Sequence, residues 1–196
     1  MDKLSLIFKR QQELTTEFQR IEVHNGLCDY ALGIPFDLSN PLAQKQLRAT
    51  AWYAIEEIGE ALNATNEQDK QEEVVDVFHF LVELLLCSGA TPEGIYPFYE
   101  EDKLEKLFTI ASAEYTTLVS TMYLCERLAD AMHCLKAKPW KQNPKETSKV
   151  IYQHKLFGVL FAFIEFAKAF GLTPDSLFNL YMGKANVNQK RIDNGA

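Results

Sequence analysis

The sequence predicts an all-α protein, a bundle of helices. Apolar residues recur at the spacing of amphipathic helices through most of the chain. Short runs of alternating Val, Ile and Thr, which would indicate strands, are absent. Glycines and Thr-Pro-acid tripeptides separate the helical segments. With 196 residues, 47% of them hydrophobic and 24% charged, the chain is predicted to form a single domain spanning residues 1–196.

The first two predicted helices flank the loop GIPFDLSNP. The first helix ends at Gly26, and one of its faces is expected to carry Leu4, Phe8, Gln11, Leu14 and Phe18. Ser39 or Asn40 is predicted to cap the second helix, because Pro41 suits the first helical position. This helix stops in the polar segment NATNEQD.

Further helices are predicted after the second one. The third helix closes at Gly89, and Thr91-Pro92-Glu93 begins a short helix. One long helix is expected over residues 102–135, followed by a loop at 136–146. Another helix then leads to Thr173-Pro174-Asp175, which opens the last one.

Residues 81–99 resemble residues 163–181. This similarity indicates either the ordinary joint between two helices or a diverged duplication of a helical hairpin. The second copy has no acids where the first has Glu73 and Asp76, so one site per chain is expected.

Two pairs of acids give the strongest indication of function. Glu57 and Glu60, and likewise Glu73 and Asp76, are three residues apart, so each pair lies on one helical face. Apolar residues flank both pairs, and burying unpaired carboxylates is costly unless a cation compensates them. Two such helices facing each other would offer about four oxygen ligands, which hard cations such as Mg²⁺ prefer.

Two neighbouring residues leave alternatives open. A ferritin-like di-iron site would need two Glu-x-x-His motifs, and only Asp76-x-x-His79 comes close. His79 is interpreted as a core histidine with its hydrogen bonds satisfied. Phe80 either belongs to the core or offers its ring to a base.

A second polar constellation lies near the C-terminus. Tyr181, Lys184, Asn188 and Arg191 share one stripe of a helix. Cations and hydrogen-bonding groups on one stripe suit phosphate oxygens, because Arg forms paired hydrogen bonds and Lys acts as a point charge. The alternative is a solvated terminal helix with cations in its last turns.

Composition excludes several other classes of protein. The formal net charge of −7 argues against a nucleic-acid partner, whose binding surface would normally be basic. The four cysteines show no metal-binding spacing and are predicted to be reduced thiols in a cytoplasmic protein. Neither a secretory signal nor a long apolar stretch is evident, so no membrane span is expected.

Together these motifs resemble those of the all-α NTP pyrophosphatase superfamily, in its branch of dimeric dUTPases and phage dCTPase-dUTPases. Its ExxE-spacer-ExxD hallmark corresponds to Glu57-x-x-Glu60 and Glu73-x-x-Asp76. The VDVFHF segment and the terminal YxxKxxxNxxRxxxG pattern are similar to later motifs of that branch. The similarity extends over residues ~8–18, 50–99 and 170–195.

The resemblance implies hydrolysis of a pyrimidine deoxynucleoside triphosphate, dUTP first, to the monophosphate and pyrophosphate. The four acids would hold two or three Mg²⁺ ions, and Glu57 or Glu60 would orient or deprotonate the attacking water. The substrate-binding residues implied are Gln11, Phe80, Tyr181, Lys184, Asn188 and Arg191. Lys184 and Arg191 would hold phosphates, Gln11 would lie near the base, and Phe80 would stack on it. A homodimer is also expected, since the apolar helices exceed what one thin bundle needs.

Three departures from the family pattern concern the base, the sugar or closure of the site. Thr15 stands where the first-helix motif usually has Asn, the segment 61–72 has no Trp, and Gly195-Ala196 replaces a terminal Gly-Tyr. The alternatives are therefore the same chemistry on dCTP or another NTP, or a catalytically inactive nucleotide-binding or interaction module.

Overall fold

The computed structural model describes residues 1–28, 31–95, 102–111, 115–138, 140–142 and 146–195, and all regular secondary structure within these ranges is helical. The all-α prediction is confirmed. The helices are α1 (Lys3–His24), α2 (Pro41–Asn63), α3 (Glu67–Ser88), α4 (Pro92–Ile95), α5 (Lys103–Ile110), α6 (Thr117–Cys134), α7 (Lys149–Ala169) and α8 (Pro174–Asp193).

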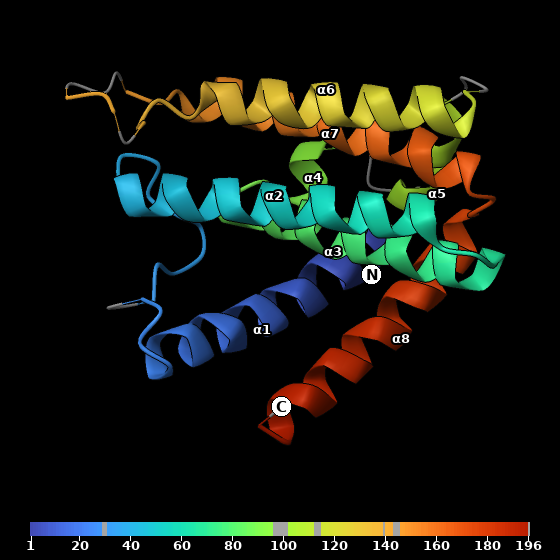
Figure 1. Cartoon of the computed structure of the whole chain (residues 1–196), viewed down its shortest axis with the longest axis horizontal. Coiled ribbons are helices and arrows are strands. Elements are labelled where there is room, and N and C mark those ends of the chain that lie inside the picture. Colours follow the sequence, from blue (N-terminus) through green and yellow to red (C-terminus); the bar gives the residue numbers. More distant parts are fainter. Residues whose placement is uncertain (29–30, 96–101, 112–114, 139, 143–145, 196) are drawn as a thin grey trace.

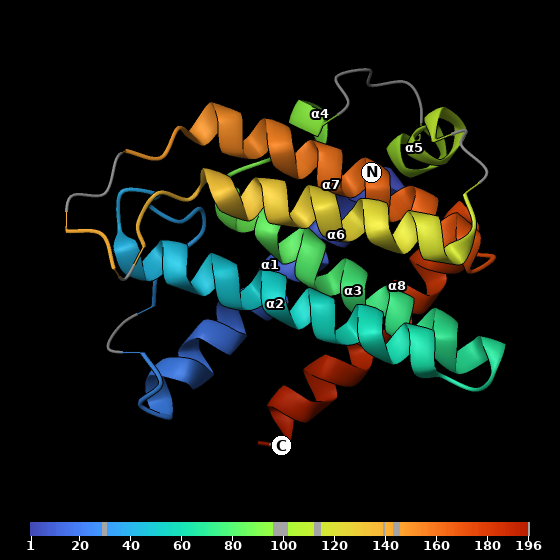
Figure 2. The same cartoon turned by 45° about the horizontal axis from the view of Figure 1, so that its top comes forward.

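Two helical hairpins stack on each other, and α1 and α8 lie beneath them (Figure 1). Helices α2 and α3 form one antiparallel pair, and α6 and α7 form the other. Helix α3 occupies the centre, because it packs against α1, α2, α7 and α8. The view in Figure 2 shows α1 and α8 diverging on the far side of the α2–α3 pair.

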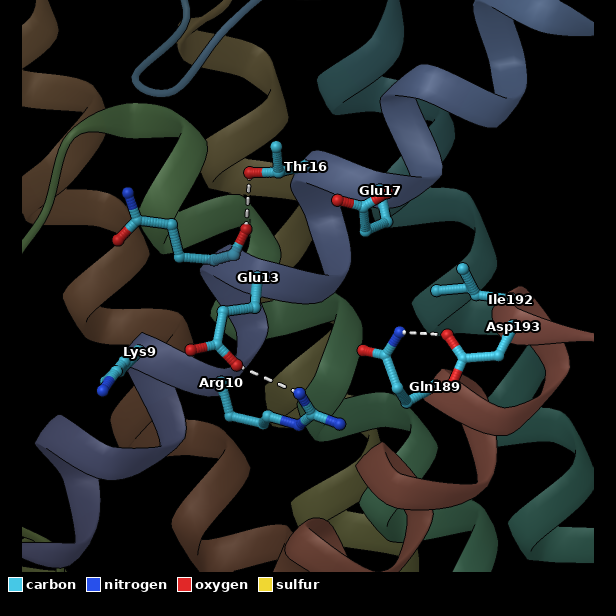
Figure 3. Close-up of a pocket in the computed structure, with 9 residues that line it drawn as sticks. Lys9, Arg10, Glu13, Thr16, Glu17, Gln189, Ile192 and Asp193 are labelled. Atoms are coloured by element: carbon cyan, nitrogen blue, oxygen red, sulfur yellow. Dashed lines mark hydrogen bonds and ion pairs between the residues drawn. The ribbon is translucent and has the colours of Figure 1, made fainter.

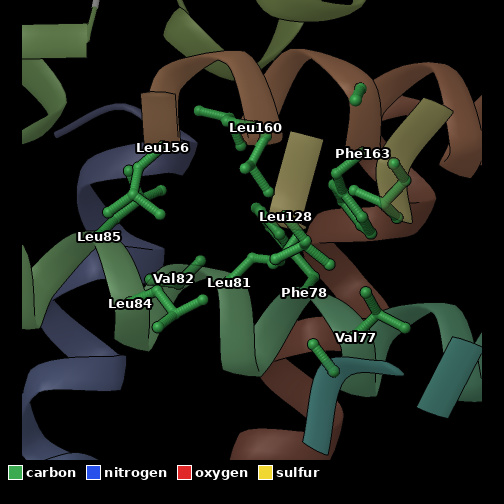
Figure 4. Packing of buried hydrophobic residues seen from close by; sticks show 14 of the residues in the cluster. Val77, Phe78, Leu81, Val82, Leu84, Leu85, Leu128, Leu156, Leu160 and Phe163 are labelled. Carbon is green, nitrogen blue, oxygen red and sulfur yellow. The ribbon is translucent and has the colours of Figure 1, made fainter. Parts of the chain in front are cut away.

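The core is apolar and lies between α3 and α7 (Figure 4). The rings of Phe78 and Phe163 stack with centroids 4.7 Å apart and planes 3° apart. Leu85 of α3 is buried beside Leu156 of α7. Burying such side chains supplies most of the favourable free energy of folding, so α3 is held firmly by this face.

Local capping explains where the helices begin and end. Asn40 is the N-cap of α2 and its side chain accepts from the Leu42 N–H, so Asn40 rather than Ser39 fills the predicted role. Gly89 ends α3 in the left-handed conformation with φ of 80°, which a residue with a Cβ adopts only at a cost. Thr173 and Ser176 form a reciprocal capping box at the start of α8.

The prediction of one long helix over residues 102–135 is wrong. Helix α5 ends with Ala111 as its C-cap, and α6 begins anew with Thr116 as its N-cap. The Thr116 side chain accepts from the Val119 N–H, and such local bonds compete with a continuous helix. The Lys168 ammonium donates to the Ala111 carbonyl, which satisfies a group left free at the break.

Three smaller expectations can also be compared with the structure. The similar segments 81–99 and 163–181 share a glycine with positive φ at the joint, 80° and 75°, although residues 96–99 lie outside the described ranges. All four cysteines are free thiols. Among the described helices, α7 alone has the length and apolar composition of a membrane span, but 56% of that window is buried inside the bundle.

Candidate functional site

The α2–α3 hairpin gathers three of the four predicted metal ligands. One carboxylate oxygen from each of Glu57, Glu60 and Glu73 lies within 4.8 Å of the other two. The spacing within α2 places its two acids on one face, and the antiparallel turn brings Glu73 opposite them. Glu60 is exposed, whereas Glu57 and Glu73 are half-buried.

The electrostatics of this cluster favour a bound cation. Burial, together with repulsion from Asp76, Glu60 and Glu73, raises the pKa of Glu57 to about 7. Burial and repulsion from Asp76 also raise the pKa of Glu73, while Lys184 opposes that shift. Carboxylates that repel one another in this way form a set of hard oxygen donors. The residues present therefore fit a divalent metal ion.

Asp76 is close to this cluster but has a different partner. Its Oδ2 lies 2.5 Å from Lys184 Nζ on α8. Burial raises the pKa of Asp76, and the hydrogen bond from Lys184 partly offsets that effect. The predicted fourth ligand is thus engaged by one of the predicted phosphate-binding residues.

A cavity of about 490 Å³ adjoins the acids and is lined by side chains of α1, α2, α3 and α8. It is large enough for a nucleotide-sized molecule. The predicted site residues on its wall are Gln11, Glu57, Asp76, Phe80, Lys184, Asn188 and Arg191. Phe80 is half-buried there, and its ring centroid lies 5.6 Å from that of Tyr53.

Tyr181 does not line this cavity. It is 0% exposed, because its ring packs edge-on against Phe78 and stacks on His79 at 3.9 Å between centroids. Its hydroxyl donates to Gln11 Oε1 at 2.6 Å. Tyr181 therefore holds Gln11 in place and is too deep to contact a phosphate itself.

His79 is a core histidine, but its hydrogen bonds are not all satisfied. Its Nδ1 lies 2.9 Å from Gln11 Oε1, and this amide oxygen can only accept, so the proton is on Nδ1. Burial lowers the pKa of His79 to about 3, which keeps the ring neutral. Nε2 is then a buried acceptor with no hydrogen-bond partner among the described residues, although other atoms of His79 line the cavity.

Several residues on the cavity wall were not predicted from the sequence. They are Phe18, Ile21, Glu22, Gln46, Thr50, Tyr53 and Glu83. Thr50 lies seven residues before Glu57, and Glu83 lies seven residues after Asp76. Residues seven apart share a helical face, so extending each acidic stripe by two turns would have found both.

A second hollow lies between α1 and α8 and encloses about 760 Å³ (Figure 3). Four of its polar side chains are paired with each other: Arg10 with Glu13 at 3.0 Å, and Gln189 with Asp193 at 2.9 Å. None of the clustered acids lines it. We therefore take the smaller cavity, which Glu57 lines together with Lys184 and Arg191, as the candidate site.

An all-helical bundle that brings clustered carboxylates together with Lys and Arg around one cavity has the features of a metal-dependent phosphate-processing protein. The model of the family described as dUTPase matches residues 3–195, so the chain belongs to this all-α, dimeric dUTPase family. At the family level this membership supports a dUTP-hydrolysing, nucleotide pyrophosphatase activity. No curated protein and no solved structure matches the chain.

Proposed function

We propose that this protein hydrolyses a pyrimidine deoxynucleoside triphosphate, dUTP first, to the monophosphate and pyrophosphate in an Mg²⁺-dependent reaction in the cytoplasm. One observation carries the proposal: the oxygens of Glu57, Glu60 and Glu73 converge within 4.8 Å beside a cavity that Lys184 and Arg191 also line. Family membership over residues 3–195 agrees with it.

Glu57, Glu60, Glu73 and Asp76 are the proposed ligands of two or three Mg²⁺ ions. When bound, these ions supply positive charge beside the triphosphate and lower the pKa of a water molecule. The mutual repulsion that raises the pKa of Glu57 supports the assignment, because a cation would remove it. Asp76 becomes available as a metal ligand when Lys184 leaves its ion pair with Asp76 and binds a phosphate oxygen.

The chain's own residues have distinct proposed roles around the reacting phosphate. Glu57 or Glu60 orients the attacking water and accepts its proton as the new P–O bond forms and the P–O bond to the departing pyrophosphate breaks. The carboxyl group then releases that proton to solvent. Lys184 and Arg191 neutralise the phosphate oxygens, with Asn188 beside them. Arg191 Nη1 already lies 3.4 Å from Asn188 Oδ1, so the two side chains are arranged together.

The remaining residues would position the nucleoside. Phe80 offers a half-buried ring for stacking on the base. Gln11 is fixed by Tyr181 and His79, and its amide also donates to Thr15 Oγ1 at 3.2 Å. A polar group held in a fixed position favours a ligand that can complete its hydrogen bonds. A ligand that cannot do so leaves buried polar groups unpaired and binds more weakly.

A homodimer forms part of the proposal. Large apolar side chains are exposed on α6 and at the start of α7: Leu118 (67%), Met122 (65%) and Val150 (76%). Exposed apolar patches of this kind often mark interfaces. Sedimentation velocity should give twice the 22.4 kDa mass of one chain, and a monomer at micromolar concentration would contradict this part.

Pyrophosphate release from a panel of dNTPs and NTPs, with Mg²⁺ and with EDTA, tests the proposal. Rapid cleavage of dUTP that EDTA abolishes would support it. Preference for dCTP or another NTP would keep the mechanism and change the substrate. Tight Mg²⁺-dependent binding of dUTP without turnover would favour an inactive binding module instead.

A further inference from the structure

The four acids of the α2–α3 hairpin do not form one equal set. Oxygens of Glu57, Glu60 and Glu73 lie within 4.8 Å of one another. The fourth acid, Asp76, is paired instead with α8, because its Oδ2 lies 2.5 Å from Lys184 Nζ. An ammonium group therefore occupies the carboxylate that would complete the proposed set of metal ligands.

This ion pair is largely shielded from solvent. The side chain of Asp76 is 15% exposed, and that of Lys184 is 27% exposed. Burial raises the pKa values of Asp76 and Glu73, and Lys184 opposes both shifts. Solvent and salt screen a partly buried pair less than a surface pair. A metal ion would therefore have to compete with Lys184 for Asp76.

Lys184 has space on two sides. Its side chain lines the nucleotide-sized cavity, and it also lines a separate hollow of about 240 Å³ between α3 and α8. Gly183, the preceding residue, forms part of the wall of this hollow and contributes no side chain there. The open space on both sides allows the ammonium group to turn away from Asp76.

We propose that Lys184 keeps the metal site incomplete until a nucleotide is bound, because its ammonium group holds Asp76 in the free protein and leaves it only for a phosphate. The three clustered glutamates are then the metal ligands available in the free protein. A triphosphate that draws Lys184 away adds Asp76 to them, so nucleotide and metal each strengthen the binding of the other. This inference rests on the proposed function, because it describes the regulation of the same site.

The strength of this effect depends on how often Asp76 is free. If the ion pair is open in about one molecule in ten, the complete site binds metal about tenfold more weakly than a site in which Asp76 is always free. Removing Lys184 should recover that factor without any nucleotide.

Binding of Mn²⁺ without nucleotide, followed by electron paramagnetic resonance, tests the proposal. Mn²⁺ suits the same oxygen ligands as Mg²⁺. Lys184→Met removes the charge and keeps an unbranched side chain, so this variant should bind Mn²⁺ at least about tenfold more tightly than the wild type. An unchanged affinity would overturn the proposal. Lys190→Met is the matched control: Lys190 is an exposed cation of the same helix, and its loss should change the affinity by less than about threefold.

A second background distinguishes the ion pair from a general effect of charge. Removing Lys184 lowers the positive charge near every clustered acid, which by itself would favour a cation. If the gain comes from the release of Asp76, it should disappear when Lys184→Met is combined with Asp76→Asn and compared with Asp76→Asn alone. If the full gain persists in that comparison, Lys184 acts without Asp76 and the proposal is wrong.

These measurements need no turnover, so they separate this inference from the proposed function. Tighter Mn²⁺ binding by Lys184→Met, lost with Asp76→Asn, would support the inference even if no triphosphate is cleaved. Cleavage of dUTP by the wild type, with no gain in Mn²⁺ affinity in Lys184→Met, would keep the proposed function and overturn the inference. Circular dichroism should show that each variant is folded, and Lys184→Gln provides a second neutral variant for the same comparison.

Discussion

The two faces of α3 differ in how their side chains are satisfied. On the α7 side, Phe78, Leu81 and Leu85 are almost completely buried against apolar neighbours. On the cavity side, Asp76 and Glu83 have raised pKa values. One face gains free energy from packing, and the other retains charges and acceptors that an apolar core would exclude.

This contrast shows how a small bundle can hold a reactive site. Stability comes from residues that take no part in ligand binding, so the cavity face can keep unfavourable groups. Altering the apolar face should therefore mainly lower the stability of the fold, and altering the cavity face should mainly change ligand binding and turnover. Substitutions on each face can test that separation, and their expected effects run from a loss of turnover to a modest gain in stability.

Neutralising a clustered acid should have the largest effect. Glu60→Gln or Asp76→Asn should lower kcat for pyrophosphate release by about a thousandfold, since the loss of one ligand charge removes several kcal/mol of stabilisation. Circular dichroism should show an unchanged helical fold. Glu56→Gln is the matched control: Glu56 is exposed, accepts from Trp52 Nε1 at 2.8 Å, and should be dispensable. Near-full activity of Glu60→Gln would refute the site assignment.

Truncation on the opposite face should affect stability instead. Phe78→Ala removes a ring that is 0% exposed and stacked on Phe163. The free energy of unfolding should fall by about 3–4 kcal/mol, as measured by guanidinium denaturation. If the variant that remains folded bound nucleotide much more weakly, the two faces would be coupled after all.

Removing a repelled charge from the cavity face should stabilise the metal-free protein. The pKa of Glu57 is raised from 4.5 to about 7, so its contribution to stability is greatest below pH 4.5 and falls as the pH rises through 7. Glu57→Gln should therefore raise the unfolding free energy at pH 8 in EDTA by about 1 kcal/mol. The gain should vanish at pH 4, and excess Mg²⁺ should reverse it because the wild type alone then has its full ligand set.

The sequence predicted the helices well where local chemistry decides them. Asn40 with Pro41 and Thr173 with Pro174 mark their helix starts through caps that depend on a few adjacent residues. The end of α5 at Ala111 was not predicted, because apolar residues have helical spacing on both sides of it. A single capping residue, Thr116, is too weak a signal to show that a new helix begins there. The acid pairs were likewise found from helical spacing, since residues three apart share a face whatever the helix packs against.

Contacts between residues far apart in the sequence could not be predicted from helix caps and helical spacing. The ion pair between Asp76 and Lys184 depends on how α8 crosses α3. Tyr181 is buried because its ring stacks on that of His79. In the sequence it shares a stripe with Lys184, Asn188 and Arg191, which indicated a side chain exposed to a ligand. Packing in three dimensions decides which side of a polar stripe faces the cavity.

The hydrogen bond between Tyr181 and Gln11 joins residues 170 positions apart, and this separation has a consequence for biosynthesis. A ribosome makes α2 and α3, with the three clustered glutamates and Asp76, well before it makes α8. At 5–20 residues per second, roughly 5–20 s separate Asp76 from Tyr181. During that interval a nascent chain could bring its carboxylates together while Gln11 and His79 still lack Tyr181. The proposed metal ligands are therefore complete in the growing chain before the proposed phosphate-binding residues, Lys184 and Arg191, have been made.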